Sequence, residues 1–138
     1  MKAFVLDCSA TLPWVFASEA TTATDGLLDQ LTSGAKAWVP ALWHLELGNV
    51  LLGAQRRKRI DQAGIEQFLG TLALYDIEVD SETIPRAWSN TLSLATRYEL
   101  TVYDATYLEL ALRKGLPIAT LDDALRKSMT KAGGKLAI

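Results

Sequence analysis

Hydrophobic and polar positions along this chain form blocks that predict strands and helices in alternation. Short apolar runs typical of strands occur at residues 3–6, 37–39, 77–79 and 118–120. The first of these has the composition of a buried parallel strand. Apolar residues recur with helical spacing in the longer segments between them. Strands that alternate with helices favour a parallel sheet with helices on both faces, so the pattern predicts an α/β fold.

The predicted helices cover most of the chain between the strands. They are expected at residues 21–31, 41–59, 62–74, 83–98, 104–114 and 123–132, with a short helical turn at 11–16. Asp61 is a suitable N-terminal cap, and Gly115 stands where a helix ends in the left-handed conformation. A terminal strand is expected at residues 135–138, whereas residues 101–103 are expected to form only a brief bridge into the next helix.

One apolar stripe is expected along the predicted helix at residues 83–98. It comprises Ile84, Ala87, Trp88, Leu92 and Ala95. Core packing is the expected role of Trp88, and equally of Trp14, Trp38 and Trp43, because the indole ring carries a large apolar surface.

Length and composition favour one globular domain. The chain has 138 residues, 49% hydrophobic and 22% charged, so we expect residues 1–138 to form a single domain with a real core. No apolar run approaches the length of a membrane span, and Asp7 interrupts the first run too early for a signal peptide. The expected location is therefore the cytoplasm, with no membrane association. A lone cysteine, Cys8, agrees with this and is interpreted as a small buried apolar residue.

The charge pattern argues against a protein held to nucleic acid by a global positive field, since the formal net charge is −2. A local basic run remains at residues 56–59, at the end of a predicted helix. Contact with phosphates is one interpretation of this run. The more common one is a solvated helix end that the helix dipole favours.

Four acidic residues stand where an apolar segment meets a turn or a helix, namely Asp7, Glu46, Asp104 and Asp122. In an open α/β sheet, ligands bind beyond the carboxyl ends of the strands. Carboxylates gathered there, without a thiol or imidazole cluster, suit Mg²⁺ or Mn²⁺ better than zinc. Four such groups without a cation would repel one another. The pattern therefore predicts a divalent metal site and phosphate-ester chemistry if the four acids lie close together in the fold.

Each acid also has a purely structural interpretation. Asp7, Asp104 and Asp122 precede predicted helical segments and could serve as N-terminal caps, and Asp123 resembles a first-turn acid at the positive end of a helix. Glu46 is harder to explain in this way, because it lies within a predicted helix. Its neighbour three residues later, Asn49, projects from nearly the same side, so the pair could serve a metal and its bound water.

Four motifs, taken in order along the chain, carry a resemblance to a known family. They are Asp7-Cys8-Ser9, Glu46-Leu47-Gly48-Asn49, Tyr103-Asp104-Ala105-Thr106-Tyr107-Leu108-Glu109-Leu110-Ala111 and Thr120-Leu121-Asp122-Asp123. This set resembles the PIN domain, and within it the toxin ribonucleases of bacterial type II VapBC toxin–antitoxin pairs. The resemblance covers essentially the whole chain and implies a Rossmann-like, three-layer α/β/α sandwich with a central parallel sheet.

The resemblance also implies a Mg²⁺- or Mn²⁺-dependent endoribonuclease. The acids that match the catalytic and metal-binding quartet of the family are Asp7, Glu46, Asp104 and Asp122. Ser9 and Thr120 match small hydroxyl positions that orient an acid or a water, Asn49 matches a polar neighbour, and Asp123 matches an additional acid of some members. Attack of a metal-activated water would release a 3′-hydroxyl and leave a 5′-phosphate.

The partners that the resemblance implies are an RNA substrate, a cognate antitoxin and a second copy of the chain in a homodimer. The antitoxin would insert a segment into a groove lined by the predicted helices at residues 21–31 and 41–74. Apolar residues there, such as Leu27, Leu28, Leu31 and Phe68, could serve a partner, a dimer or the core. Trp14 and Trp43, beside the first two acids, could stack on unpaired bases instead of packing in the core.

Other small α/β proteins fit the sequence less well. A response-regulator receiver domain would need adjacent acids after the first strand, where Asp7 stands alone, and a haloacid-dehalogenase-like phosphatase would need an acid where Ser9 stands. Catalysis through paired histidines is excluded, since His44 is the only histidine and is expected to pack or cap. The remaining alternative is a catalytically idle PIN-like module that binds RNA or protein.

Overall fold

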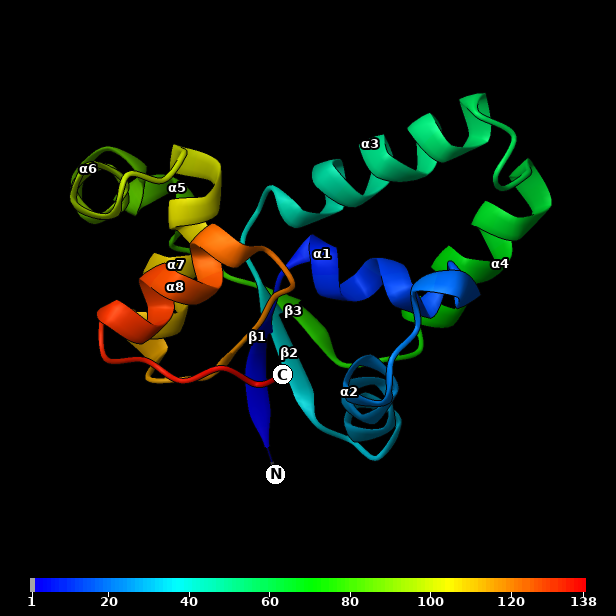
Figure 1. The fold of residues 1–138 in the computed structure, drawn as a ribbon, viewed down its shortest axis with the longest axis horizontal. Coiled ribbons are helices and arrows are strands. Elements are labelled where there is room, and N and C mark those ends of the chain that lie inside the picture. The colour runs from blue at the N-terminus through cyan, green and yellow to red at the C-terminus, as the bar shows by residue number, and fades with distance from the viewer. Residues whose placement is uncertain (1) are drawn as a thin grey trace.

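A parallel sheet forms the centre of the structure, a computed structural model that describes residues 2–138 (Figure 1). Its strands are β1 (Ala3–Leu6), β2 (Lys36–Val39), β3 (Ile77–Val79) and β4 (Ile118–Ala119), in the order β3-β2-β1-β4. The chain adds β2 and β3 on one side of β1 and then crosses to add β4 on the other. The boundary between β1 and β4 is therefore the topological switch point, where open α/β sheets bind their ligands.

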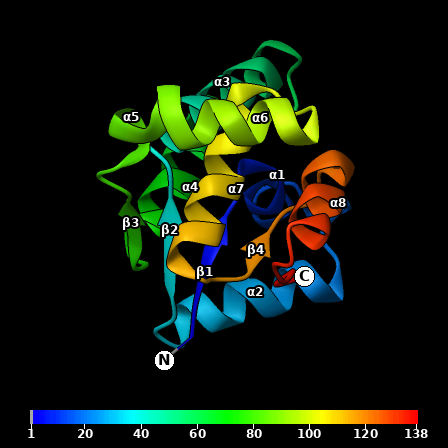
Figure 2. The ribbon, with the colours of Figure 1, turned by 90° about the vertical axis from the view of Figure 1, so that its left-hand side faces the viewer.

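Helices cover both faces of the sheet and complete an α/β/α arrangement. Their bounds are α1 (Cys8–Thr11), α2 (Thr22–Thr32), α3 (Trp43–Arg56), α4 (Gln62–Leu72), α5 (Thr83–Arg86), α6 (Leu92–Tyr98), α7 (Val102–Lys114) and α8 (Asp123–Lys131). Short 3₁₀ turns follow α1 at Leu12–Trp14 and Ala17–Glu19, and a π-turn at Ala87–Thr91 joins α5 to α6. One side of the sheet carries α5, α6 and α7, with α8 beside α7, and the other carries α1, α2 and α4 (Figures 1 and 2). The predicted fold class is confirmed.

The core lies on both sides of β1. Phe4, Val5 and Leu6 are at most 1% exposed, as expected for a central parallel strand covered on two faces. The longest run of buried residues belongs to α7, at residues 105–111, and this helix packs directly on β1. Cys8 is also buried and unpaired, which confirms its interpretation as a small apolar residue. Among residues 2–138, no helix is long and apolar enough to cross a membrane.

Several helix ends confirm the local signals in the sequence. The side chain of Asp61 accepts a hydrogen bond from the backbone N–H of Gly64 at 2.8 Å and so caps α4. Gly115 ends α7 with φ at 64°, in the left-handed region where glycine has no steric cost. The helix predicted at 41–59 is shorter than expected, because Lys58 takes a positive φ and turns the chain towards α4.

The strand predicted at residues 135–138 is wrong, and the brief segment at residues 101–103 belongs to the start of a helix. Residues 101–103 form no strand, because Thr101 caps α7 by accepting the backbone N–H of Asp104 at 3.1 Å, and the helix starts at Val102. Residues 135–138 form only an isolated bridge between Leu136 and Ile118. In both places a local capping or turn preference overrides the short β-like composition.

The apolar stripe predicted along residues 83–98 does not face the core. Ile84 is 75% exposed, Trp88 is 92% exposed and Leu92 is 46% exposed, so the expected core role of Trp88 is wrong. Ala95 is the one member of the stripe that is buried, beside Thr91, while Leu94 and Tyr98 are partly buried against the core. Small side chains let these helices approach α7 closely. The hydrophobic pattern alone assigns the opposite face to the core, because the larger apolar side chains lie there. Trp43 does lie in the core, while Trp14 and Trp38 are partly buried against it.

Candidate active site

The switch point of the sheet brings together the two acids that follow its neighbouring strands. Asp7 directly follows β1 and is 6% exposed, and its backbone N–H donates to the carbonyl of Ala119 at 2.9 Å. Asp122 lies three residues beyond the end of β4 and caps α8, accepting the backbone N–H of Leu125 at 2.9 Å. The carboxyl ends of β1 and β4 meet because these parallel strands pair side by side. The capping interpretation therefore holds for Asp122, and it leaves the acid at this edge.

Two hydroxyl groups fix the carboxylate of Asp7. The hydroxyls of Ser9 and Thr120 donate to its Oδ2 at 2.6 Å and 2.7 Å. Each hydroxyl in turn accepts a backbone N–H from the turn after β4, from Leu121 at 2.9 Å and from Asp122 at 3.1 Å. The side chain of Asp7 is thereby tied to the same turn that carries Asp122. These contacts support the role that the sequence suggested for both hydroxyls.

Helices α3 and α7 contribute the other two acids. Glu46 lies in the first turn of α3 and is partly buried, and Asp104 lies in the first turn of α7, also partly buried. The two helices are linked by Tyr107, which is fully buried and donates its hydroxyl to Oε1 of Glu46. Sequence reasoning missed Tyr107 as a site residue. The available signal was its spacing, because residues three apart on a helix share a face and Asp104 is three residues earlier.

The four carboxylates perturb one another electrostatically. Burial raises the pKa of Asp7, and the negative charge of Asp122 adds to this effect. Burial likewise raises the pKa of Glu46, with contributions from Asp7 and Asp104, although the hydrogen bond from Tyr107 opposes the shift. Burial also raises the pKa of Asp104, and the charges of Asp122 and Asp7 follow in importance. The four acids therefore lie close enough together to disfavour simultaneous ionisation.

No basic side chain neutralises this group among residues 2–138. The ion pairs found there use other acids: Glu19, Asp76, Glu78, Asp80, Glu82 and Glu109. A divalent cation fits the chemistry of the donor set, because it would supply the missing positive charge to hard oxygen ligands. In the described part of the chain, however, no three His, Cys, Asp or Glu side chains are placed so that they could hold one metal ion. Direct ligation by three of the acids therefore requires their side chains to turn towards a shared ion.

Two other predicted site residues stay in solvent. Asn49 is exposed one turn after Glu46 on α3, and Asp123 is exposed in the first turn of α8. His44 is exposed as well and packs edge-on against Trp43, with ring centroids 4.9 Å apart, which fits its expected packing role.

The basic run at residues 56–59 lies away from the acids. Arg56, the last residue of α3, is about 15 Å along the helix from Glu46 at 1.5 Å per residue. Arg59 is held by Glu19 at 3.0 Å and lies over the ring of Phe16 at 4.3 Å. At least one member of the run therefore has a structural role.

Comparisons with known proteins identify relatives of this arrangement. A family model described as the PIN domain matches residues 4–128. No curated protein matches the chain. Among solved structures, the chain is similar to the crystal structure of PAE2754 from Pyrobaculum aerophilum, with a TM-score of 0.69 and 22% identity over 92% of this chain and 84% of that one. It is also similar to a toxin–antitoxin complex from Klebsiella pneumoniae, with a TM-score of 0.58 and 16% identity over 86% of each chain. At these identities the two structures establish similarity of fold.

Proposed function

The chain belongs to the PIN domain family, and from this premise we propose that it is a metal-dependent endoribonuclease and the toxin of a VapBC-like toxin–antitoxin pair. PIN domains are generally nucleases, so the family match supports hydrolysis of nucleic acid. The observation that carries the proposal is the gathering of acids beside the switch point of the sheet, where burial and the charges of neighbouring acids raise the pKa of Asp7, Glu46 and Asp104. The similarity to a toxin–antitoxin complex supports the toxin assignment.

Each side chain has a defined task in the proposed reaction. Asp7, Glu46, Asp104 and Asp122 bind one or two Mg²⁺ or Mn²⁺ ions, with Asp123 and Asn49 as additional polar groups near them. When bound, the metal supplies a water of lowered pKa and stabilises charge on the phosphate oxygens. Ser9 and Thr120 keep the carboxylate of Asp7 in one orientation, so that little reorganisation is needed when substrate arrives.

Cleavage of a mixed panel of transfer, ribosomal and messenger RNA tests this proposal. Purified protein, freed of any bound partner, should cleave at least one RNA with Mg²⁺ or Mn²⁺ and none with EDTA. Asp7→Asn and Glu46→Gln should abolish cleavage, while Asp29→Asn, which changes an exposed acid on α2, should not. A matching set of single-stranded DNA separates ribonuclease activity from general nuclease activity. Cleavage that survives both EDTA and Asp7→Asn would contradict the proposal.

The alternative of a catalytically idle PIN-like module is favoured by one observation, the lack of a preformed three-residue metal cage in the described part of the chain. Titration of the protein with Mn²⁺ distinguishes the two functions. An active nuclease binds the ion through the acids, so Asp7→Asn weakens binding. An idle module shows no binding that depends on Asp7.

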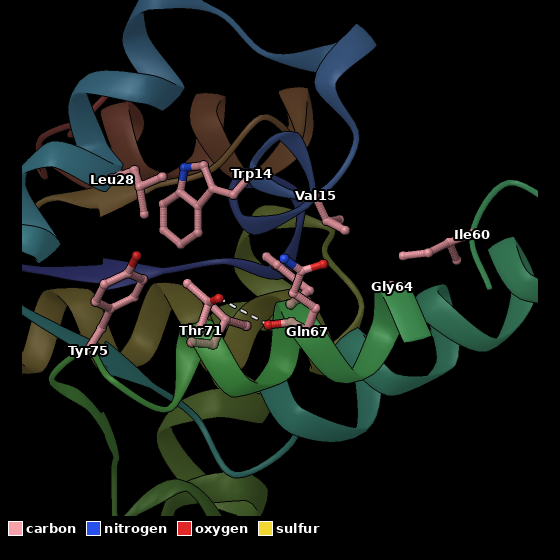
Figure 3. Close-up of a pocket in the computed structure, with 10 residues that line it drawn as sticks. Trp14, Val15, Leu28, Ile60, Gly64, Gln67, Thr71 and Tyr75 are labelled. Carbon is pink, nitrogen blue, oxygen red and sulfur yellow. Dashed lines mark hydrogen bonds between the residues drawn. The ribbon is translucent and has the colours of Figure 1, made fainter. Parts of the chain in front are cut away.

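We propose that the antitoxin binds in an open pocket of about 400 Å³ on the side of the sheet that carries α2 and α4. Figure 3 shows Trp14 and Leu28 on one side of this pocket and, across from them, Gln67 and Thr71 on α4 and Tyr75 just after it. Of the apolar residues that the sequence left unassigned, Leu27 and Leu31 are buried in the core, whereas Leu28 and Phe68 line the pocket. An apolar side chain of an antitoxin segment is the occupant that this lining suits.

We propose that the outward face of the segment from α5 to α6 is the interface of the homodimer. Ile84, Trp88 and Leu92 are spaced four residues apart and are all exposed, and residues 87–96 include no charged residue. An uncharged apolar face is compatible with a second copy of itself, since no like charges meet across a two-fold axis. Aromatic residues such as tryptophan are also enriched at the cores of interfaces.

A further inference from the structure

We propose that Tyr107 is a positioning residue that holds the carboxylate of Glu46 for metal binding. The inference rests on the proposed function, because it assigns a task to a residue through one of the proposed metal ligands. Tyr107 lies 61 residues after Glu46 in sequence, on α7, and its hydroxyl donates to Oε1 of Glu46 on α3.

The environment of Tyr107 makes its hydroxyl a fixed donor. The side chain is fully buried, and its ring belongs to the hydrophobic core. Core packing therefore locks the ring, and the hydroxyl can reach only what the core presents to it. Glu46, by contrast, is only partly buried and sits at the end of a flexible side chain. The rigid partner in this pair is the phenol, so the phenol orients the carboxylate.

The placement of Tyr107 on α7 also links two of the acids. Asp104 precedes it by three residues on the same helix, so both side chains emerge from one helical face. A single rigid helix thus carries one acid and, through the phenol, sets the orientation of another. The hydrogen bond between Tyr107 and Glu46 thus joins α3 to α7 beside the two acids.

The site repeats this design at Asp7. There, too, buried or partly buried hydroxyls, those of Ser9 and Thr120, donate to one oxygen of the carboxylate. A hydrogen bond to a carboxylate favours its ionised form and fixes its geometry, and both effects favour metal ligation. Loss of such an outer partner typically weakens metal affinity 10- to 100-fold.

Titration of the metal-free protein with Mn²⁺, followed by calorimetry, tests the role of Tyr107. Tyr107→Phe removes only the hydroxyl and should weaken Mn²⁺ binding roughly 10- to 100-fold. The matched control is Tyr103→Phe, the same change four residues earlier on α7 at a side chain that is 67% exposed, and it should bind within about twofold of wild type. The double variant Tyr107→Phe with Glu46→Gln should bind no more weakly than Glu46→Gln alone, since the hydroxyl acts through that carboxylate.

A second variant tests the same hydrogen bond without changing a residue of the hydrophobic core. Glu46→Asp retains the charge but draws the carboxylate back from the phenol by one methylene. It should weaken Mn²⁺ binding to a similar extent and should then be insensitive to Tyr107→Phe. Thermal unfolding of each metal-free variant, recorded beside the titrations, identifies any loss that comes from a damaged fold.

The outcomes separate this inference from the proposed function. Wild-type affinity in Tyr107→Phe, together with weak binding in Glu46→Gln, overturns the role of Tyr107 and leaves the metal site intact. Full additivity in the double variant also overturns it, because the hydroxyl would then act elsewhere. Unchanged Mn²⁺ binding in both Glu46→Gln and Asp7→Asn rejects the metal ligands themselves, and the inference fails with them.

Discussion

At the scale of single residues, the hydroxyl of Thr120 links the acids to the turn that follows β4. It is fully buried, donates to Asp7 and accepts the backbone N–H of Asp122. The side chain of Thr120 thus bonds both to the carboxylate of Asp7, which follows β1, and to the backbone of the turn that follows β4. Both partners are buried or partly buried, so neither can replace this bond fully with water.

Replacement of Thr120 by valine keeps the shape of the side chain and removes both bonds. We expect Thr120→Val to lower the free energy of unfolding by roughly 1–3 kcal/mol, since a buried carboxylate loses one of its two hydroxyl donors and a backbone N–H loses its acceptor. Urea denaturation of the metal-free protein measures this change. Thr96→Val, at an exposed threonine whose hydroxyl bonds to the carbonyl of Leu92, should have a much smaller effect. Equal losses in the two variants would contradict the role given to Thr120.

The raised pKa values of the acids make the stability of the metal-free protein depend on pH. Because burial and like charges raise the pKa of Asp104 in the folded state, the folded protein holds this proton more tightly than the unfolded chain. The corresponding stabilisation is present below the unfolded pKa, near 4, and is lost as the pH rises through the folded value. Asp104→Asn removes this loss, so the variant should gain stability relative to wild type as the pH rises above about 4.

Thermal unfolding at several pH values, with EDTA present, measures the difference between the two proteins. Addition of Mn²⁺ at pH 7 should stabilise wild type more than Asp104→Asn, because the ion binds the charges that repel one another without it. A difference in stability that stays constant with pH would argue that the charge of Asp104 is not perturbed by the other acids.

The individual acids could be predicted from the sequence, whereas their supporting contacts could not. Asp7 and Asp122 follow apolar strand runs, and parallel strands bring such positions to one edge. The contact between Tyr107 and Glu46 joins two helices that are far apart in sequence, and no local pattern encodes it. Ser9 and Thr120 were identified only through a family resemblance, because a hydroxyl after a strand is equally typical of a turn.

At the scale of elements, α7 is the helix on which the site depends, and an ion-pair network ties it to the sheet. Arg113, near its C-terminal end, contacts Asp80 at 2.5 Å and Glu109 at 2.7 Å. Asp80 follows β3 and is 4% exposed, and Glu109 is 5% exposed. The two buried carboxylates share one guanidinium, and the hydrogen bonds that Arg113 donates to Glu109 and Asp80 raise the pKa of Arg113. The network fixes one end of α7 while its other end carries Asp104.

Removal of this guanidinium leaves the buried carboxylate of Asp80 without its cation and leaves Glu109 with Arg86 alone, at 3.6 Å. Arg113→Met should therefore lower the free energy of unfolding by roughly 3–5 kcal/mol, the usual cost of breaking a buried pair from one side. Chemical denaturation measures the effect at pH 7. Arg97→Met, at an exposed arginine on α6, serves as the control and should change stability by less than about 1 kcal/mol. A small effect of Arg113→Met would mean that water or another cation replaces the guanidinium.

The prediction of elements succeeded where the apolar pattern and the end signals agreed. β1 and β3 have the bounds expected from their short apolar runs, and α4 starts at the cap that Asp61 provides. The segment from α5 to α6 was located correctly but oriented wrongly. Its buried side includes the small residues Thr91 and Ala95, and hydrophobicity gives these less weight than the tryptophan on the opposite side.

At the scale of the whole molecule, the exposed face around Trp88 bears on assembly. If this face is the proposed homodimer interface, wild type should have about twice the monomer mass of 15.1 kDa in solution. Trp88→Glu would bring two charges together across the symmetry axis and should yield monomers at micromolar concentration. Light scattering coupled to size-exclusion chromatography measures the mass of each protein.

The control for this experiment is Leu74→Glu, which adds the same charge at a leucine that is 82% exposed at the end of α4. Its mass should equal that of wild type. A monomeric wild type, or a dimer that persists in Trp88→Glu, would show that copies of the chain do not meet through this face.

The order of the strands also has a consequence for when the protein becomes active during its synthesis. All residues that line the pocket proposed for the antitoxin lie between residues 14 and 75. The set of four acids, by contrast, is complete only after Asp122 has been synthesised and β4, which precedes it, has paired with β1. A ribosome that adds about 5–20 residues per second needs a few seconds to make the intervening chain. On the proposed function, the residues that line the antitoxin pocket are therefore synthesised seconds before the last of the proposed metal ligands, so the binding surface for the inhibitor is encoded ahead of the complete catalytic set.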